Sequence, residues 1–211
     1  MAILPIRTVP DPILRRKAKP VSTVDDSVRK LARDMIETLH HARGVGLAAP
    51  QIGRLQRLIV IQMEGEDPRV LINPDITRRE GEREVEEGCL SVPGYLGRIL
   101  RSEKIKARAV DEWGAKVRLT ADQLLAQAVE HEVDHLNGIL YLDHLRSHED
   151  LYEAGQTSEA EHEHEYQVEV EDQGMLKSRG ESRVLTVRNA EGGVAEVTGE
   201  EIVEASDRDG V

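Results

Sequence analysis

The sequence predicts an α+β fold in which mixed or antiparallel β-sheets surround a central metal-binding helix, followed by an acidic C-terminal extension. The predicted elements run in the order helix, strands, helix, without the regular alternation of a doubly wound parallel sheet. The second predicted helix carries two histidines four residues apart, His131 and His135. Charge is also uneven, because residues 155–211 carry 15 acidic and 5 basic side chains, a net charge of −10 that leaves −2 for residues 1–154.

The composition of the 211-residue chain limits the classes of protein to which it can belong. The formal net charge is −12, and no apolar run approaches the roughly 18 residues of a membrane-spanning helix. The single cysteine cannot form an internal disulfide, and the N-terminal residues lack the apolar core of a secretion signal. We therefore expect a cytoplasmic protein with no membrane partner. The acidic balance and the scarcity of aromatic residues argue against direct nucleic-acid specificity.

The first predicted helix runs from about residue 25 to Arg43. Asp25 or Asp26 can cap its N-terminus, and Gly44 can end it. Apolar residues recur at helical spacing along one side, namely Val28, Leu31, Met35, Ile36 and Leu39. Several β-like runs follow, at residues 57–62, 70–73, 77–85, 99–110 and 116–119.

The second predicted helix carries the residues suited to chemistry. Thr120 and Gln123 have the spacing of a capping box at its start. His131, Glu132 and His135 continue its apolar stripes, so they are expected to be buried, which is costly without partners. Two imidazoles four residues apart lie on one face of a helix and can bind one metal ion, while the carboxylate between them can accept a proton from water. The simpler alternative is a pair of hydrogen-bonded core histidines.

A catalytic metal site of this kind usually has three protein ligands, so a third must come from outside the helix. The extended histidine pattern of one protease group fits Gly138 but requires a histidine where this chain has Tyr141. His144 and His148 lie in a charge-rich segment and are more simply surface residues. The single cysteine, Cys89, is the better candidate, because a thiolate and two imidazoles leave one coordination position free. A lone cysteine is otherwise usually an inert buried side chain.

Three segments of the chain resemble the three signature motifs of the peptide deformylase family, in identity, order and approximate spacing. They are GVGLAAPQIG at residues 44–53, EGCLS at residues 87–91 and HEVDH at residues 131–135. The resemblance covers about residues 3–150. It implies a bacterial-type enzyme of protein biosynthesis, which processes the N-terminal methionine by removing the formyl group from formyl-methionyl nascent polypeptides and releasing formate.

The resemblance also implies the metal site. Cys89, His131 and His135 would hold one divalent metal per chain, Fe²⁺ in the native enzyme, with Ni²⁺, Co²⁺ or Zn²⁺ as substitutes. Thiolate and imidazole ligands are compatible with several of these ions, so ligand chemistry alone does not choose between them.

Three further residues receive catalytic roles from the same resemblance. Glu132 would act as the general base and then as the general acid. Gln51 and the backbone N–H of Leu90 would stabilise the negative charge that develops on the formyl oxygen. Loss of one such donor typically lowers the rate by about 100- to 1000-fold.

The glycines of the motifs suggest how the peptide is bound. An extended substrate can pair its backbone in β-fashion with the segment around Gly46 and with Gly88, which reads few side chains. The methionine side chain would enter an apolar pocket formed by Val45, Leu90, Ala128 and the stem of His131.

Two other functions remain open at the level of sequence. A zinc peptidase that cleaves internal amide bonds would need a pocket open at both ends and leaves Cys89 unexplained. A catalytically silent homologue could bind peptides or ribosomes, although it would have no chemical need for the complete set of catalytic residues. For the enzyme itself we expect at most a transient ribosome contact.

The chain is expected to divide into a catalytic domain at residues 1–154 and an acidic extension at residues 155–211. The extension lies beyond the resemblance, and its composition predicts partly disordered or weakly structured chain. Its Glu-His run at residues 161–165 is more simply solvated than metal-bound, and short β-like alternations occur within residues 183–203.

Overall fold

The computed structural model describes residues 2–155, 184–188 and 194–198, and it divides the chain into two units, Met1–Ala154 and Gly155–Val211. The helices are α1 (Asp26–Ala42) and α2 (Gln123–Asn137), with short 3₁₀ helices at Pro12–Arg15, Ala49–Ile52, Tyr141–His144 and His148–Asp150. The strands of the first unit are β1 (Gly46–Ala48), β2 (Leu58–Ile61), β3 (Arg69–Glu80), β4 (Arg83–Cys89), β5 (Val92–Arg101), β6 (Lys104–Val110), β7 (Lys116–Asp122) and β8 (Leu151–Glu153).

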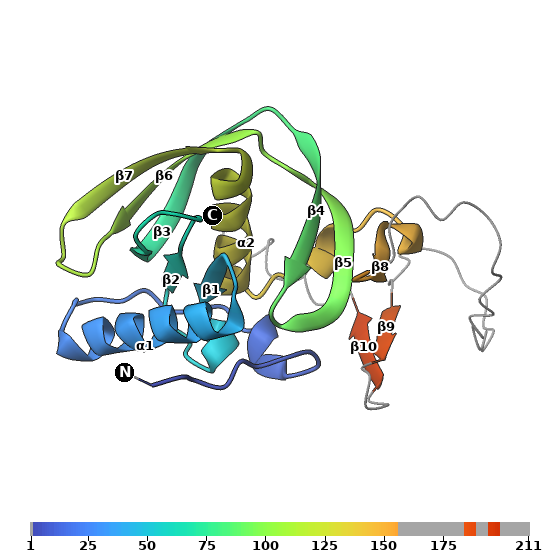
Figure 1. Ribbon diagram of the computed structural model, residues 1–211, viewed down its shortest axis with the longest axis horizontal. Coiled ribbons are helices and arrows are strands. Elements are labelled where there is room, and N and C mark those ends of the chain that lie inside the picture. The colour runs from blue at the N-terminus through green and yellow to red at the C-terminus, as the bar shows by residue number, and fades with distance from the viewer. Residues whose placement is uncertain (1, 156–183, 189–193, 199–211) are drawn as a thin grey trace, which may run out of the picture. The chain divides into compact units, whose positions relative to one another are not determined.

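The strands of the first unit form two antiparallel sheets, and α2 contacts both of them (Figure 1). One sheet has the order β1-β2-β3-β6-β7 and the other the order β4-β5-β8. The second sheet meets α2 through a hydrogen bond of 3.0 Å from the Gln127 side chain to the Glu86 carbonyl on β4. The predicted α+β class, with antiparallel sheets around a central helix, is confirmed.

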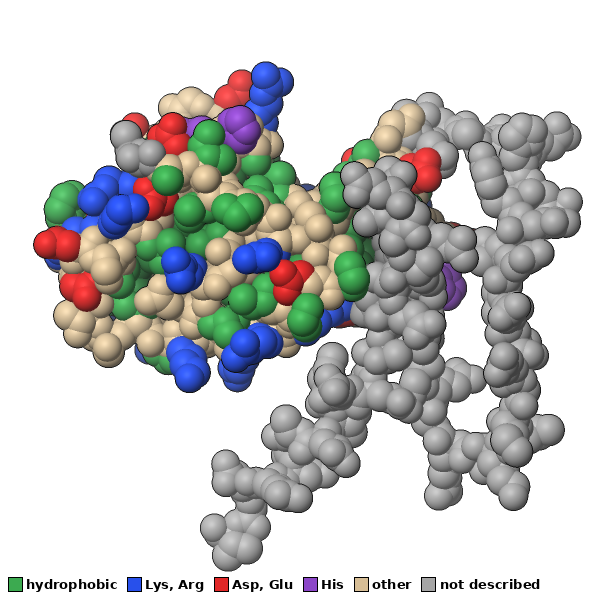
Figure 2. Space-filling view, turned by 90° about the horizontal axis from the view of Figure 1, so that it is seen from below, with side chains coloured by type: hydrophobic (Ala, Val, Ile, Leu, Met, Phe, Trp, Pro, Cys, Tyr) green, Lys and Arg blue, Asp and Glu red, His purple; other side chains and the backbone are tan. Residues whose placement is uncertain are grey.

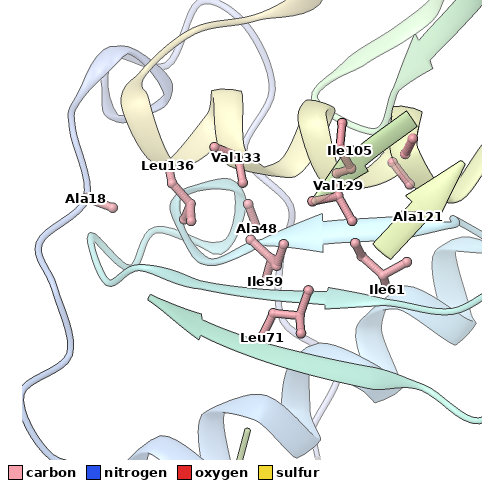
Figure 3. Close-up of a cluster of buried hydrophobic side chains, with 12 residues drawn as sticks. Ala18, Ala48, Ile59, Ile61, Leu71, Ile105, Ala121, Val129, Val133 and Leu136 are labelled. Carbon is pink, nitrogen blue, oxygen red and sulfur yellow. The ribbon is translucent and has the colours of Figure 1, made fainter. Parts of the chain in front are cut away.

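The five-stranded sheet is covered on both faces by apolar clusters. On one face Val129, Val133 and Leu136 of α2 pack on the sheet; Figure 3 shows them beside Ile59, Ile61, Leu71, Ile105 and Ala121. On the other face Met35 and Leu39 of α1 pack against Leu47, Leu58, Val60, Val70 and Ile72. Because the core contains no Phe, aliphatic side chains supply this packing.

The first helix follows the prediction closely. Asp25 caps it by accepting hydrogen bonds from the N–H groups of Ser27 and Val28, both at 3.0 Å. At the other end Arg43 adopts a left-handed conformation with φ of 54°, so the chain leaves the helix one residue before the predicted Gly44.

Three local predictions were wrong. The alternating run at residues 77–85 is not one strand, because the chain turns at Gly81, whose φ is 67°, between β3 and β4. The run at residues 99–110 is also divided, because β5 ends at Arg101 and β6 begins at Lys104. The capping box is also absent, because Thr120 lies in β7 opposite Lys106 and the N-cap of α2 is Asp122, without a side-chain hydrogen bond. The three-residue strand β1, which the sequence did not predict, lies in the first signature motif.

No described helix is long and apolar enough to cross a membrane. Figure 2 shows acidic and basic side chains scattered between apolar ones on one face of the first unit, as expected from its near-neutral charge balance. In the second unit β9 (Val184–Arg188) and β10 (Val194–Thr198) form an antiparallel pair. The Glu-His run at residues 161–165 lies outside the described residues.

Replacing Ile105 with Ala should destabilise the first unit by about 2–5 kcal/mol, because this fully buried side chain packs between β6 and α2 and its loss leaves a cavity. Lys106→Ala, on the exposed face of the same strand, should change the free energy of unfolding by no more than about 0.5 kcal/mol. Urea unfolding of both variants checks this, and equal costs would contradict the assignment of Ile105 to the core.

Candidate active site

The fold brings the three sequence motifs together. Gln51 comes from the 3₁₀ helix after β1, Cys89 from the end of β4, and His131 and His135 from α2. The ligand atoms of Cys89, His131 and His135 lie within 4.8 Å of one another. Among the described residues this is the one group of three or more such side chains with metal-binding geometry.

Cys89 is surrounded by donors that suit a thiolate. His135 Nε2 lies 3.2 Å from its Sγ, and the backbone N–H of Ser91 donates to the same sulfur at 3.3 Å. The amide of Gln51 approaches it at 3.6 Å. The two imidazole rings stand nearly perpendicular, with their centroids 4.8 Å apart, so both can present a nitrogen to one point beside the sulfur.

Glu87 orients the first histidine. Its carboxylate lies 2.5 Å from His131 Nδ1 and also accepts two hydrogen bonds from Arg101, at 2.8 and 3.0 Å. Burial alone would raise the pKa of Glu87, but the hydrogen bonds from His131 and Arg101 outweigh it and lower that pKa to about 2. An ionised Glu87 keeps the proton of His131 on Nδ1, which leaves Nε2 free to bind a metal.

The buried charges continue beyond Glu87 toward the surface. Arg101 also donates to Asp134 at 2.6 Å, and Asp134 lies 2.9 Å from His144 Nε2. Burial would raise the pKa of Asp134, but the hydrogen bond from His144 and the charge of Arg101 keep it below its usual value. His144, which sequence reasoning placed on the surface, is therefore half-buried at the end of this chain of charges.

Glu132 lies beside the ligand atoms in a different environment. Its side chain is buried, and this burial raises its pKa to about 7. A Cβ at Gly46 would collide with the Glu132 carboxylate, so a glycine is required where β1 passes this side chain. Three buried side-chain polar atoms of the described residues have no hydrogen-bond partner, and two of them are Glu132 Oε2 and His135 Nδ1. The site therefore holds polar groups that the protein itself does not satisfy.

Gln51 is held firmly in the site. Its Oε1 accepts a hydrogen bond from the N–H of Ala48 at 2.7 Å, and its Nε2 donates to the Ser91 hydroxyl at 3.1 Å. Gln51 is 1% exposed, so its amide is fixed in one orientation that directs the NH₂ group toward Cys89.

A cavity of about 540 Å³ opens beside these residues. All the residues that the sequence assigned to peptide or oxyanion binding line it: Val45, Gly46, Gln51, Gly88, Leu90 and Ala128. Sequence reasoning missed other parts of the wall, including Leu124, Gln127, Tyr95 and Ala154. Leu124 and Gln127 precede Ala128 and His131 by one helical turn, so the helical period that placed the latter pair could have found them.

The donor set fits a divalent metal ion. A thiolate and two imidazoles form a recognised set of three ligands with a further position open, and Glu87 supplies the outer hydrogen bond that such histidines usually make. An α+β fold that holds such a set beside a buried carboxylate, in the wall of a cavity, defines a metal-dependent hydrolase.

Comparison with known proteins identifies the family. The chain matches the polypeptide deformylase family over residues 3–150 and belongs to it. It is 48% identical over 160 residues to a peptide deformylase of Dehalococcoides mccartyi strain CBDB1, a match that covers 75% of this chain and 96% of the relative. The family removes the N-formyl group from nascent polypeptides, so this chain is a deformylating hydrolase.

Solved structures agree with this assignment. A peptide deformylase from Legionella pneumophila is similar with a TM-score of 0.67 and 47% identity, covering 68% of this chain and 86% of that one. A peptide deformylase from Synechococcus elongatus in complex with actinonin has a TM-score of 0.69 and 43% identity, covering 71% and 82%. The family match ends at residue 150, so the whole of the second unit lies beyond it.

Arg101→Met should destabilise the protein by about 3–5 kcal/mol, because it leaves the buried carboxylates of Glu87 and Asp134 without their counter-ion. Arg108→Met is the matched control, since Arg108 forms a 2.8 Å pair with Asp75 on the surface and its loss should cost at most about 1 kcal/mol. Urea unfolding compares the two variants. Similar losses in the free energy of unfolding of the two variants would show that the buried network stabilises the protein no more than a surface ion pair does.

Proposed function

We propose that this chain deformylates nascent peptides with Cys89, His131 and His135 as the ligands of one divalent metal ion, Fe²⁺ in the cell. The proposal rests above all on the convergence of these three ligand atoms within 4.8 Å beside a buried carboxylate. A bound divalent ion would polarise the formyl carbonyl and lower the pKa of a neighbouring water molecule from about 15.7 toward 7.

Glu132 moves the protons in this proposal. Its Oε2 has no hydrogen-bond partner among the described residues, so it is available to accept a proton from the attacking water. The same carboxyl group then donates that proton to the departing amine nitrogen, which would otherwise leave poorly. A pKa of about 7 suits a group that must both accept and donate a proton near neutral pH.

Gln51 and the backbone N–H of Leu90 stabilise the oxyanion. The amide of Gln51 is preorganised by Ala48 and Ser91, so no reorientation is needed when negative charge develops on the formyl oxygen. An uncharged donor also binds the neutral carbonyl of the substrate less strongly than the charged intermediate, which favours the transition state.

The peptide binds between two strand edges. β1 is an edge of the five-stranded sheet and β4 an edge of the three-stranded sheet, and Gly46 and Gly88 on these strands both line the cavity. An extended peptide that pairs with both backbones is recognised mainly through its main chain. The methionine side chain enters the cavity beside Val45, Leu90 and Ala128 and the stem of His131.

Residues 1–154 form the catalytic domain in this proposal, and residues 155–211 form an acidic appendage that takes no part in the reaction. We place the enzyme in the cytoplasm, where nascent chains are made, and expect its ribosome contact to be transient. The net charge of −10 in the appendage would be repelled by ribosomal RNA, so the appendage should weaken or orient that contact.

The purified protein should hydrolyse formyl-Met-Ala-Ser but neither the unformylated peptide nor an internal amide bond. A chelator should abolish this activity, and added Ni²⁺ or anaerobic Fe²⁺ should restore it, because the metal site is needed to activate the attacking water. Metal analysis alongside the assay checks the requirement. Full activity in a metal-free sample would exclude this mechanism, and cleavage of internal bonds would favour a peptidase.

Glu132→Gln should retain the metal and lose at least about 100-fold in kcat, because the amide keeps the shape of the side chain but cannot carry the proton. Cys89→Ala is the informative comparison, since it should lose metal affinity instead. Metal content and kcat measured on both variants separate the two roles. Near-normal turnover of metal-loaded Glu132→Gln would assign the base to another residue.

A chain ending at Ala154 should deformylate the short peptide at close to the full-length kcat/KM. This cut retains β8, which pairs with Tyr95, Leu96 and Gly97 of β5, and the 2.8 Å hydrogen bond from the Ala154 N–H to Gly94. A chain ending at Asp150 is the control: it lacks β8 and should lose activity. A large loss in the longer of the two would show that the appendage supports catalysis.

A further inference from the structure

The outward side of β3, β6 and β7 carries an excess of basic side chains. We call this surface the cationic sheet face. Residues directly opposite one another in the strand register share this side. Its basic members are Arg78, Lys104, Lys106, Arg108, Lys116 and Arg118, and its acidic members are Asp75, Glu80 and Asp122.

This face is the uncovered continuation of a buried one. α1 packs over β1, β2 and the first part of β3, and Val110 on β6 still belongs to that apolar cluster. Alternate residues of a strand point the same way, so Arg108, Lys106 and Lys104 follow Val110 on the same side. There the sheet leaves the cover of α1, and all three side chains are exposed.

The arrangement places like charges opposite one another. Arg108 faces Arg118 across β6 and β7, and Lys106 faces Arg78 across β6 and β3. Directly opposite like charges destabilise a sheet. On the same face Lys104 lies opposite Glu80 and Asp122, and Arg108 also lies opposite Asp75, so the like-charge contacts are confined to these two pairs.

Few acidic side chains compensate this repulsion. The face has two ion pairs, Arg78–Glu80 at 2.7 Å and Arg108–Asp75 at 2.8 Å. Within the described residues its other basic members, Lys104, Lys106, Lys116 and Arg118, form no ion pair. Basic residues on β7 could protect a sheet edge from aggregation, but β6 lies between two strands and needs no such protection.

An exposed tryptophan stands at the end of the same hairpin. Trp113, the only Trp of a chain without Phe, is 74% exposed in the turn between β6 and β7. The turn is well defined, because the Asp111 carboxylate accepts hydrogen bonds from the N–H groups of Trp113 and Ala115 at 2.9 and 2.8 Å. The exposed indole ring is therefore held in place by an ordered turn and is available to a flat partner.

We propose that the cationic sheet face binds RNA, with its Lys and Arg side chains on phosphates and Trp113 stacked on an unpaired base. Phosphates complement the charge of this face, and a base offers the planar surface that an indole ring stacks on without sequence preference. An acidic polypeptide would complement the basic side chains but would offer no planar base to stack on Trp113. The choice of ribosomal RNA rests on the enzyme's action on nascent chains, which emerge from an RNA-rich particle.

The full-length protein should bind short single-stranded RNA and purified bacterial ribosomes, and RNA should quench its tryptophan fluorescence, which comes from Trp113 alone. Lys106→Glu with Arg118→Glu should lower the affinity at least about 10-fold and make its dependence on log salt shallower by about 1 to 1.5. Trp113→Ala should lower the affinity by roughly 5- to 150-fold and leave the salt dependence unchanged.

The control variant combines Arg16→Glu and Lys17→Glu, two exposed residues outside this face, and should bind RNA nearly as the wild type does. All variants should hydrolyse the free formyl-peptide normally, which shows that they fold and keeps this test separate from that of the activity. Equal loss in the control would show a general charge effect and overturn the proposal. Equal quenching by polyglutamate, or ribosome binding that none of these substitutions changes, would also overturn it.

Discussion

The buried ion network around Arg101 is the constraint on which the rest of the structure depends. Arg101 on β5 bridges Glu87 on β4 and Asp134 on α2, so one guanidinium joins two strands of the three-stranded sheet to the central helix. Buried charges are tolerated only when fully paired, which fixes the distance between these elements. The same network ends on His131 Nδ1 and thereby sets the ring orientation of a proposed metal ligand. The same ion network therefore stabilises the fold and fixes the geometry of the site.

The sequence predicted those elements whose pattern is local. The helical spacing of apolar residues in α1 and its Asp25 cap are both contained in one short segment, and the structure confirms them. The predicted strand at residues 77–85 was wrong, because alternation continues through the turn and a single positive φ at Gly81 separates β3 from β4. Thr120 has the residues of a capping box around it but pairs with Lys106 in a ladder. In such cases the pairing between strands outweighs the local sequence motif. The sequence of one segment alone does not reveal that pairing.

The residues of the candidate site were likewise predicted only in part. The motifs gave the three candidate ligands and Glu132 because their chemistry is distinctive, and the part of the cavity wall that was predicted consists of motif residues and Ala128. Glu87 was missed as the partner of His131, although it lies two residues before Cys89 in the second motif. Its role depends on β4 running beside α2, and it is visible only once residues 44 positions apart in the chain meet. The contact of His144 with Asp134 was missed for the same reason.

The cavity combines two demands that an enzyme of nascent chains must meet together. The reacting end requires fixed geometry, and there the side chains are buried and tied by hydrogen bonds, as Gln51 is to Ala48 and Ser91. The proposed peptide end must accept many sequences, and there Gly46 and Gly88 in the cavity lining expose backbone instead of side chains. Gly46 contributes to both the reacting end and the peptide end of the cavity. It lets the backbone of β1 approach the Glu132 carboxylate, so the edge proposed to pair with the peptide lies beside the proposed proton carrier. In the proposed binding mode the peptide is recognised mainly through its main chain, so tolerance of the residues that follow the formyl-methionine comes from the backbone exposed at Gly46 and Gly88.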